Sequence, residues 1–563
     1  MNAQLLLRCR QLIVRTVTPL LCAASTVALA QPSPLPAPRK PVSSSIFTVL
    51  RPSDYHHYVT EFAADELAAT KKSPTDEWPW MVANIPFFSS SNKEFEEMYY
   101  FRWYAWEKHV VKTPRGYVIT EWLPKPADPN GFYGALPDAA PFHLNEARWL
   151  RNPEIAADYA RMWAEPKAGP RKYSFAWADS VRNVVLATGN RKLGTDLLPA
   201  LIANFEAWRD HYDPAVGLYW QIDTRDAMEK SIGGDGYRTP LNSYMYADGE
   251  AIADFARDAG ENKVAHEYAT KSATLRNLIE TKLWNPKDQF YEDLSPAANS
   301  GIRTQKKFKD PGTVLQFSNV RELIGYIPWE FYATTPSHDV AWKQLFNPQG
   351  FDGKYGPTTA ERRSPRFRFP SSDQCTWNGP SWPYATTQTL LALARLLNGA
   401  PQHDMTDQDY YRLFSNYVLS QHIKLADGRT IDWIDEDLDA DTDEWIAKDI
   451  LIRKHKQVGR GNYYNHSGFA DPLITGMLGL RPRADNRIIL HPLLPQGEWS
   501  YFAVDGLPYH GHLLAIVYDQ TGKQYHRGRG LMLFVDGKKV AGRPTLGPLD
   551  ASLPRSSATP SLH

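Results

Sequence analysis

Cys375-Thr-Trp-Asn-Gly-Pro-Ser-Trp-Pro-Tyr384 is the stretch that decides the fold of this chain. Its Gly-Pro and Trp-Pro pairs hold the backbone extended, because a residue before proline avoids the helical region, so a helix can begin just after them. An apolar stretch follows, with Leu390, Leu391, Leu393, Leu396 and Leu397. Trp377 and Trp382 fit the floor of a pocket, and they fit a plain hydrophobic core equally well.

Apolar residues with helical spacing occupy the middle of the chain. Two examples are Leu198, Leu201, Ile202, Phe205 and Trp208, and then Val264, Tyr268, Leu275, Leu278 and Ile279. Segments of this kind follow one another with loops between them, which predicts helical hairpins in series. Because the chain lacks the fixed-period repeat of a solenoid, we expect the hairpins to close into a ring.

After about Arg481 the residue pattern changes from helical spacing to short β-prone runs. They occupy residues 487–490, 501–504, 513–517 and 531–535, separated by turn signals such as Asp505-Gly506 and Asp536-Gly537. We therefore predict five parts. They are a signal peptide (1–30), a Pro/Ser-rich linker (31–45), a large helical domain (46–481), a small β domain (482–548) and a disordered tail (549–563).

The charges cancel, with 63 basic and 63 acidic residues. Nothing in this balance indicates a nucleic acid or an anionic membrane as a partner, so we expect a substrate that is neutral or lightly charged. Aromatic residues make up 12% of the chain, with 18 Trp and 29 Tyr. Rings with a flat apolar face and a polar edge suit sugars, although large helical proteins also use them to fill their cores.

The first thirty residues have the pattern of a secretory signal peptide. Arg8, Arg10 and Arg15 precede a mostly apolar run over residues 17–29, and Ala28-Leu29-Ala30 forms an A-x-A cleavage site. The run is shorter than the roughly 20 residues that span a membrane. We therefore expect an exported protein, periplasmic or secreted, without stable membrane association.

Cysteine usage excludes an intramolecular disulfide in the exported chain. Cys9 and Cys22 lie in the predicted leader, which leaves Cys375 alone. Cys375 stands beside Trp377 in an apolar and aromatic segment, so we expect it to be a structural residue that behaves as a small buried hydrophobe.

Residues 218–229 gather charged groups beside a tryptophan. Asp223, Arg225, Asp226 and Glu229 lie within seven positions and close to Trp220. This crowding indicates a hydrogen-bonding pocket. A solvated surface loop is the alternative.

Residues 433–445 form a run of alternating acids between two tryptophans and contain Glu436. Alternating Asp suggests calcium, but a loop of the EF-hand type needs Gly and Glu where counting from Asp437 gives Thr442 and Lys448. A calcium site of another design stays open. Carboxylates beside aromatic rings also suit glycoside hydrolysis, which uses one protonated carboxyl and one carboxylate on opposite faces of the sugar.

Trp377-Asn-Gly-Pro-Ser-Trp-Pro-Tyr384 resembles the W-x-G-P-x-W motif of the helical-toroid glycosidases of the family 63 type. This group includes processing α-glucosidase I, mannosylglycerate hydrolase and, more distantly, trehalase. Further segments resemble the group in the same order, namely Ala227-Met-Glu-Lys-Ser231, Pro240-Leu-Asn-Ser-Tyr244, residues 434–444 and His466-Ser-Gly-Phe-Ala-Asp471. The match spans roughly residues 90 to 480, and only the tryptophan motif is close to literal.

The resemblance implies a mainly α fold, an (α/α)6 toroid with a small C-terminal antiparallel β domain. It implies inverting hydrolysis of a terminal, α-linked glycosidic bond of a carbohydrate substrate, with no cofactor and no metal. Glu229 takes the position of the general acid and Glu436 that of the general base. Because the acid of this group is usually the shorter Asp, Asp226 and Asp223 stay open as alternative acids.

The same segments supply the side chains expected to bind the sugar. They are Trp220, Arg225, Asn242, Trp377, Asn378, Trp382 and Trp433.

Two other functions use similar residues. A polysaccharide lyase on a helical toroid would recruit a Tyr or His base and a group that neutralises a uronate, for which the chain offers His143, Asn145, Arg148 and Tyr244. A non-catalytic glycan-binding protein would use the aromatic residues alone.

The leader generates a direct prediction. Cleavage after Ala30 should leave a mature chain that begins near Gln31 and fractionates with soluble protein outside the cytoplasm. N-terminal sequencing or intact mass measures this, and full-length protein in the membrane fraction would contradict it.

Overall fold

The computed structural model describes residues 46–123, 132, 134–296, 314–399, 401–402, 404–456, 459 and 461–554. The chain divides into two units, Met1–Val42 and Ser43–His563, and every described residue belongs to the second. The predicted signal peptide and linker therefore lie outside the described residues, as do residues 555–563 of the predicted tail.

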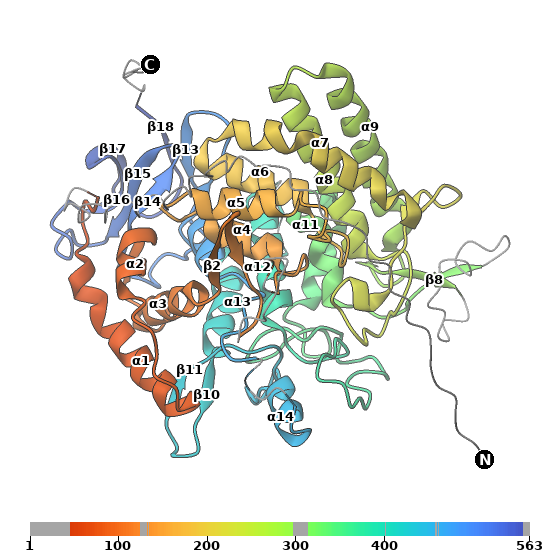
Figure 1. Ribbon diagram of the computed structural model, residues 1–563, viewed down its shortest axis with the longest axis horizontal. Helices are drawn as coiled ribbons and strands as arrows, with labels where there is room; N and C mark the ends of the chain where they lie inside the picture. Colours follow the sequence, from red (N-terminus) through yellow and green to blue (C-terminus); the bar gives the residue numbers. More distant parts are fainter. Residues whose placement is uncertain are drawn as a thin grey trace, which may run out of the picture. The chain divides into compact units, whose positions relative to one another are not determined.

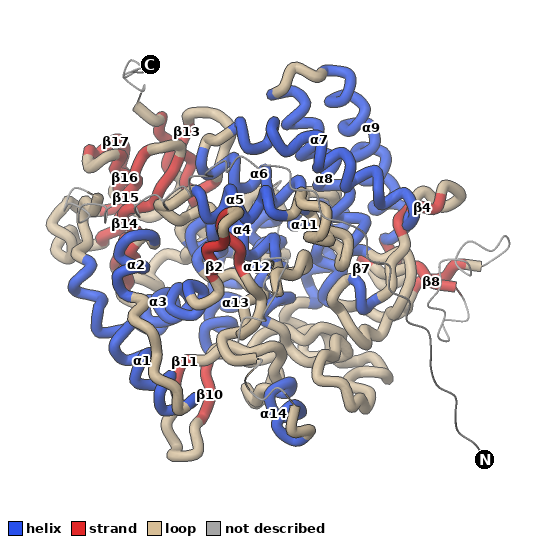
Figure 2. The backbone as a smooth tube through the Cα atoms, in the orientation of Figure 1, coloured by secondary structure: helices blue, strands red, loops and turns tan. Residues whose placement is uncertain are grey.

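Helices form most of the regular structure before residue 480 (Figures 1 and 2). They are α1 (His56–Thr70), α2 (Trp78–Asn84), α3 (Lys93–Glu107), α4 (Ala140–Ala147), α5 (Glu154–Met162), α6 (Trp177–Thr188), α7 (Arg191–Ala207), α8 (Thr239–Asp258), α9 (Asn262–Leu278), α11 (Ile327–Glu330), α12 (Pro383–Leu397), α13 (Asp407–Leu419), α14 (Ile446–Arg453) and α15 (Ala470–Pro472). The two segments with helical spacing fall in α7 and α9, with Trp208 and Ile279 in the helical turns that directly follow, so that prediction is confirmed.

Helix α8 lies at the centre of this packing and is buried along almost its whole length. It contacts α6, α7, α9 and α11, and Figure 1 shows α7, α8 and α9 side by side. The approach to α7 depends on Gly194, because a Cβ there would lie 2.2 Å from the Phe255 ring of α8. Such close approach fixes neighbouring helices in one arrangement.

Helix α12 begins where the sequence predicts. Trp382 is extended (φ −125°, ψ 128°) and Pro383 occupies the first turn, where a missing N–H has no cost. The helix is buried on most of its surface and packs against α11 and α13.

Tryptophan is mainly a core residue here. Nine of the 18 tryptophans are among the largest fully buried side chains, namely Trp103, Trp149, Trp163, Trp177, Trp208, Trp342, Trp377, Trp433 and Trp499. The high aromatic content is therefore explained largely by packing.

The β part contains two antiparallel sheets. The larger has the order β1-β14-β15-β16-β17, and the smaller has the order β12-β13-β18. The strands are β1 (Phe87–Ser90), β12 (Leu480–Arg481), β13 (Arg487–Leu490), β14 (Tyr501–Tyr509), β15 (His512–Asp519), β16 (Gly530–Val535), β17 (Lys538–Arg543) and β18 (Leu549–Ser552). The four predicted β-prone runs fall in β13 to β16, and Asp536-Gly537 is a two-residue turn with positive φ at both positions, so these predictions are confirmed.

Five two-stranded sheets complete the regular structure. They pair β2 (Val110–Thr113) with β3 (Gly116–Ile119), β4 (Tyr212–Asp213) with β5 (Leu218–Tyr219), β6 (Trp284–Asn285) with β7 (Phe290–Tyr291), β8 (Leu294–Pro296) with β9 (Leu315–Phe317), and β10 (His422–Lys424) with β11 (Thr430–Asp432). None of the described helices is both long and apolar enough to cross a membrane.

Three expectations about the β part are corrected. Residues 549–552, expected in a disordered tail, pair with β13 as β18, because Leu490 finds a partner in Leu549. Asp505-Gly506, expected as a turn, is an irregularity within β14, where Gly506 accommodates φ 70°. The predicted boundary at residue 482 is crossed by β1, which comes from the N-terminal region and pairs with β14.

The buried Asp505 anchors the start of the described chain. Its carboxylate accepts backbone hydrogen bonds from Thr48 (3.0 Å), Val49 (2.5 Å) and Leu50 (2.8 Å), and one from Gly506 (2.9 Å). These four N–H donors require a side chain in which both oxygens accept hydrogen bonds, and an ionised carboxylate has two such oxygens.

Asp505→Asn should therefore destabilise the fold. The amide offers one acceptor and sets an NH₂ group against N–H donors, which should cost about 1–3 kcal/mol in the free energy of unfolding. Denaturant titration measures this, with the exposed Asp485→Asn as the matched control, expected within about 0.5 kcal/mol of wild type. Equal stability of the two variants would show that Asp505 anchors nothing.

Candidate active site

A cavity of about 480 Å³ brings together carboxyl groups and aromatic rings. Its carboxyls belong to Glu121, Asp138, Glu229, Asp373 and Glu436. Its rings belong to Trp122, Tyr173, Trp377, Trp382, Tyr384, Tyr464 and His466. The two glutamates singled out in the sequence as acid and base therefore line one space.

Glu229 lies on an irregular loop after the short 3₁₀ helix Asp223–Arg225. Ala227 (φ 59°) and Lys230 (φ 61°) on either side adopt the left-handed conformation, which non-glycine residues rarely adopt. The Asp223 carboxylate holds this loop by accepting from the backbone N–H of Lys230 (3.1 Å). Burial raises the pKa of Glu229 to about 8, so the carboxyl retains its proton at neutral pH.

Glu436 follows β11 and is only 3% exposed. Its two neighbours, Asp435 and Asp437, are fully buried. Asp437 accepts from the backbone N–H of Ala447 (3.0 Å) in the first turn of α14. The backbone carbonyl of Glu436 lies 3.2 Å from Nε2 of His466. The loop is thus fixed on both sides of the glutamate.

The alternating acids beyond Glu436 are engaged by arginine rather than gathered around one point. Asp439 pairs with Arg368, and Asp441 pairs with Arg362 at 2.7 Å. Among the described residues, no group of three or more His, Cys, Asp or Glu side chains is arranged to hold a metal ion.

Residues 375–382, which we call the linking segment, connect the loops of the two glutamates. The backbone N–H of Trp377 donates to the backbone carbonyl of Glu229 (2.9 Å), and the Cys375 thiol donates to Oε1 of Glu436 (2.9 Å). Ser381 and Leu438 exchange two backbone hydrogen bonds (2.8 and 2.9 Å). The tryptophan motif therefore connects the loop of Glu229 to the loop of Glu436.

Two family models match the chain. The family model of the mannosylglycerate hydrolase MGH1-like glycoside hydrolase domain matches residues 133–467, more than half of the 563 residues, including Glu229 and Glu436. The chain belongs to this family. The model of the glycosyl hydrolase family 65 C-terminal domain matches residues 480–541, which contain β12 to β16.

Three similar proteins cover different shares of the chain. A solved structure of a sialidase is 35% identical, has a TM-score of 0.80, and covers 90% of this chain but 45% of its own. A family 63 mannosylglycerate hydrolase from Thermus thermophilus is 13% identical with a TM-score of 0.43, covering 60% of this chain and 91% of its own. An uncharacterized protein of Borreliella burgdorferi is 24% identical over 174 residues, 31% of this chain and 32% of its own. This chain thus spans less than half of the sialidase and about a third of the Borreliella protein.

In this member of the MGH1-like family, the alternative acids lie outside the cavity lining. Asp226 is buried in an ion pair with Arg238 (2.5 Å), which also binds Asp293 (2.9 Å). Burial raises the pKa of Asp226 to about 6, while the guanidinium of Arg238 opposes the rise. The Asp223 carboxylate accepts a hydrogen bond from the backbone N–H of Lys230 in the loop. Of the three acids considered, the structure brings only Glu229 to the cavity.

The side chains expected to bind sugar divide into two groups. Trp377 and Trp382 line the cavity and stack on each other, with ring centroids 4.9 Å apart and an interplanar angle of 22°. Trp220, Arg225, Asn242, Asn378 and Trp433 are not among the lining residues. The guanidinium of Arg225 lies over the ring of the lining residue Tyr173, 5.7 Å from its centroid.

Packing and backbone contacts explain why the others point elsewhere. Asn242 donates to the backbone carbonyls of Tyr219 and Arg238 (both 2.8 Å), and Asn378 donates to that of Phe369 (2.8 Å). Trp220 stacks on His211, with centroids 4.5 Å apart, and Trp433 lies under the Lys448 ammonium at 4.4 Å. These polar and aromatic side chains thus support the structure around the cavity and do not line it.

Cys375 differs from its expected role. It is half-buried, lines the cavity and donates to Glu436, because the extended linking segment turns its side chain toward the base loop. A small buried hydrophobe was the wrong description.

Sequence reasoning missed Asp138 and Glu121. Asp138 is 5% exposed, burial raises its pKa to about 7, and its carbonyl accepts from the Tyr384 hydroxyl (3.2 Å). It lies far along the chain from the loops of Glu229 and Glu436 and stands beside no aromatic residue, so nothing local marks it. Glu121 directly precedes Trp122, and an acid beside a tryptophan was the signal used elsewhere.

The residues available to a lyase do not meet at the cavity. His143 is buried between the backbone carbonyl of Asn465 (2.5 Å) and the Tyr159 hydroxyl (3.1 Å), and Arg148 is buried in an ion pair with Asp471 (2.6 Å). The Tyr244 hydroxyl accepts from Gln388 (2.8 Å). Burial lowers the pKa of His143 to about 4. These contacts are structural.

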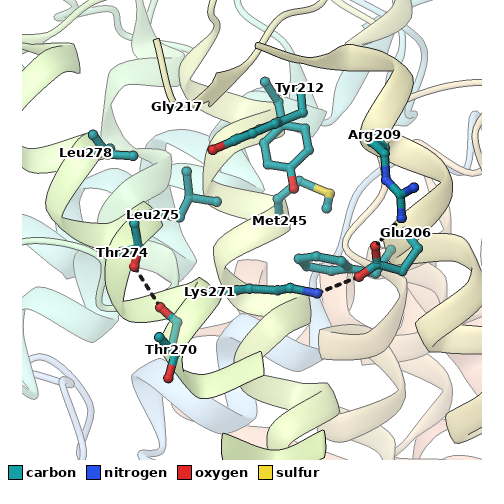
Figure 3. A pocket seen from close by; sticks show the side chains of 12 residues that line it. Glu206, Arg209, Tyr212, Gly217, Met245, Thr270, Lys271, Thr274, Leu275 and Leu278 are labelled. Atoms are coloured by element: carbon teal, nitrogen blue, oxygen red, sulfur yellow. Dashed lines mark hydrogen bonds and ion pairs between the residues drawn. The ribbon is translucent and has the colours of Figure 1, made fainter. Parts of the chain in front are cut away.

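A second hollow, of about 340 Å³, lies between α7, α9 and the β4–β5 hairpin (Figure 3). Its walls are largely apolar, with Tyr212, Met245 and Leu275 among them. Its carboxylate, Glu206, already pairs with Lys271 (2.7 Å) and Arg209 (3.0 Å). An acid/base mechanism needs two carboxyls, and the lining of this hollow contains one.

Proposed function

We propose that this protein is an inverting glycoside hydrolase that removes a terminal, α-linked sugar, with Glu229 as general acid and Glu436 as general base. One observation carries the proposal. Two glutamates about two hundred residues apart line the same aromatic cavity and are connected through one segment. Membership of the MGH1-like family supports it.

We assign the helical part to an (α/α)6 toroid of six helical hairpins. Consecutive helices pack in pairs, α6 with α7, α8 with α9 and α12 with α13. A closed ring of such pairs would bring loops from distant parts of the chain to one end. That geometry would account for a site built from residues near 121, 229, 375 and 436.

The environment of the two glutamates supports the roles. Burial raises the pKa of Glu229 to about 8, and the nearby charges of Asp138 and Glu436 act in the same direction. Glu229 would give its proton to the leaving oxygen as the glycosidic bond breaks. Glu436 would take a proton from the water that attacks the anomeric carbon from the opposite face. Inversion is carried over from the resemblance to family 63 enzymes.

The charges around the cavity favour a neutral sugar. Five carboxyls line it, whereas its lining cations are Lys172 and Lys230, and Lys230 pairs with Asp373 (3.4 Å). No arginine is among the lining residues, so a sugar carboxylate would lack the bidentate partner that such groups prefer. We therefore propose a neutral glycoside as the substrate, in preference to the sialoside that similarity to a sialidase suggests.

A panel of nitrophenyl glycosides and α-linked disaccharides, with an aryl sialoside included, tests this order. Release of nitrophenol from a neutral glycoside supports the proposal. Release from the sialoside alone would replace it by a sialidase, and new ultraviolet absorbance from an unsaturated product would replace it by a lyase. Sugar binding without turnover would leave a glycan-binding protein.

The location of the protein follows from the leader alone. We propose that it acts outside the cytoplasm, on the evidence of the charged, apolar and A-x-A regions within residues 1–30.

Glu229→Gln and Glu436→Gln should each lower kcat by roughly 10²–10⁴-fold while sugar binding persists, since a general acid or base typically contributes that much. Steady-state kinetics and calorimetric binding measure the two effects. Glu206→Gln, in the second hollow, is the matched control and should keep wild-type kcat. On an aryl or fluoride glycoside with a good leaving group, Glu229→Gln should recover partly and Glu436→Gln should recover less. Recovery in Asp226→Asn, with near-normal turnover in Glu229→Gln, would transfer the acid role to Asp226.

The pH dependence follows from the raised pKa of Glu229. The acid works only when protonated, so activity should fall as the pH rises through about 8. On a substrate with a good leaving group this alkaline fall should weaken, because proton donation matters less. Profiles of kcat/KM on the two substrate types measure this, and an alkaline fall near pH 5 on both would contradict the burial of the acid.

A further inference from the structure

The thiol of Cys375 touches the residue assigned as the base. Its Sγ lies 2.9 Å from Oε1 of Glu436 and donates to it. Cys375 and Trp377 both line the cavity. The contact therefore lies inside the site rather than in the packing behind it.

The backbone next to Cys375 is held from two sides. The indole N–H of Trp382 donates to the carbonyl of Thr376 (2.9 Å), and the N–H of Trp377 donates to the carbonyl of Glu229 (2.9 Å). Trp377 and Trp382 are buried and stacked. A side chain carried on so constrained a backbone has a defined direction, so its hydrogen bond can orient a partner.

We propose that Cys375 is a positioning residue that orients Glu436 for general base catalysis. This rests on the function proposed above. The S–H donor binds Oε1 and restrains the orientation of the carboxylate. A thiol is a weak donor, so it orients the carboxylate while withdrawing less of its basicity than an ammonium or guanidinium would.

Kinetics of Cys375→Ala and Cys375→Ser test the donor. The two variants differ by one hydroxyl group, which can replace the thiol as a donor. The alanine variant should lose about 3- to 10-fold in kcat with KM nearly unchanged, as expected for one net hydrogen bond. The serine variant should remain within about 2-fold of wild type. Melting curves confirm that both fold.

The acid side of the pH profile provides a readout that a merely structural role would not move. A donor to the carboxylate favours its charged form, so its removal should shift the acid-side loss of activity to higher pH in Cys375→Ala. Cys375→Ser should keep the wild-type position. Wild-type kinetics and an unmoved profile in the alanine variant would overturn the proposal. So would equal losses in the alanine and serine variants.

Alkylation of Cys375 by iodoacetamide tests the contact without any turnover. A thiolate beside the Glu436 carboxylate is disfavoured by like charge, so Glu436→Gln should react several-fold faster than wild type. Glu229→Gln, which also removes one cavity carboxylate, is the matched control and should change the rate less. Peptide mass mapping assigns the label to Cys375. An unchanged rate in Glu436→Gln would show that the contact is absent. A slower rate would show that the carboxylate draws the thiol proton, and either result overturns the positioning role.

The two proposals fail in different ways. The function fails when Glu436→Gln keeps wild-type turnover, whatever Cys375 does. The positioning role fails when Glu436→Gln is inactive but Cys375→Ala matches wild type in kcat and pH profile.

Discussion

The hydrogen bond from the backbone N–H of Trp377 to the backbone carbonyl of Glu229 is the constraint on which the site depends. The loop of Glu229 contains two non-glycine residues with positive φ, a conformation that persists only where surroundings hold it. The linking segment supplies that hold and binds the base loop through Cys375 and Ser381. Pro380, two stacked tryptophans and Pro383 directly after the segment stiffen it. One short stretch of chain thereby sets the spacing of two glutamates that are distant in sequence.

The carboxyl groups in this region differ in their ion pairs and therefore in their pKa values. Asp226 and Glu229 lie three residues apart, yet Arg238 compensates the first and no such ion pair forms at the second among the described residues. Burial therefore raises the pKa of Glu229 to about 8, which suits the role of proton donor proposed above. Asp138 adds a further carboxyl to the same cavity, with a pKa raised to about 7. Burial is the main cause of the raised pKa of Glu229, and the nearby charges of Asp138 and Glu436 act in the same direction.

The β part is joined to the helical part by main-chain contacts rather than by a simple linker. Strand β1, between α2 and α3, pairs with β14, and the Asp505 carboxylate holds residues 48–50. The first and last portions of the described chain are therefore interlocked. Such long-range pairing explains why the described residues form one unit although the sequence texture changes near residue 481.

Local chemistry in the sequence determined the helical middle, the start of α12 at Pro383 and the β-prone runs of the C-terminal part, and the resemblance to family 63 glycosidases supplied Glu229 and Glu436 as the candidate pair. These features depend on periodicity, on proline and on a short motif, all of which act within a few residues. Only the tertiary structure decided that Asp226 faces Arg238, that Trp220 and Trp433 face the core, that Asp138 enters the cavity and that Cys375 touches Glu436. The direction in which a side chain points is set by packing between segments that are hundreds of residues apart, and no local pattern carries that information.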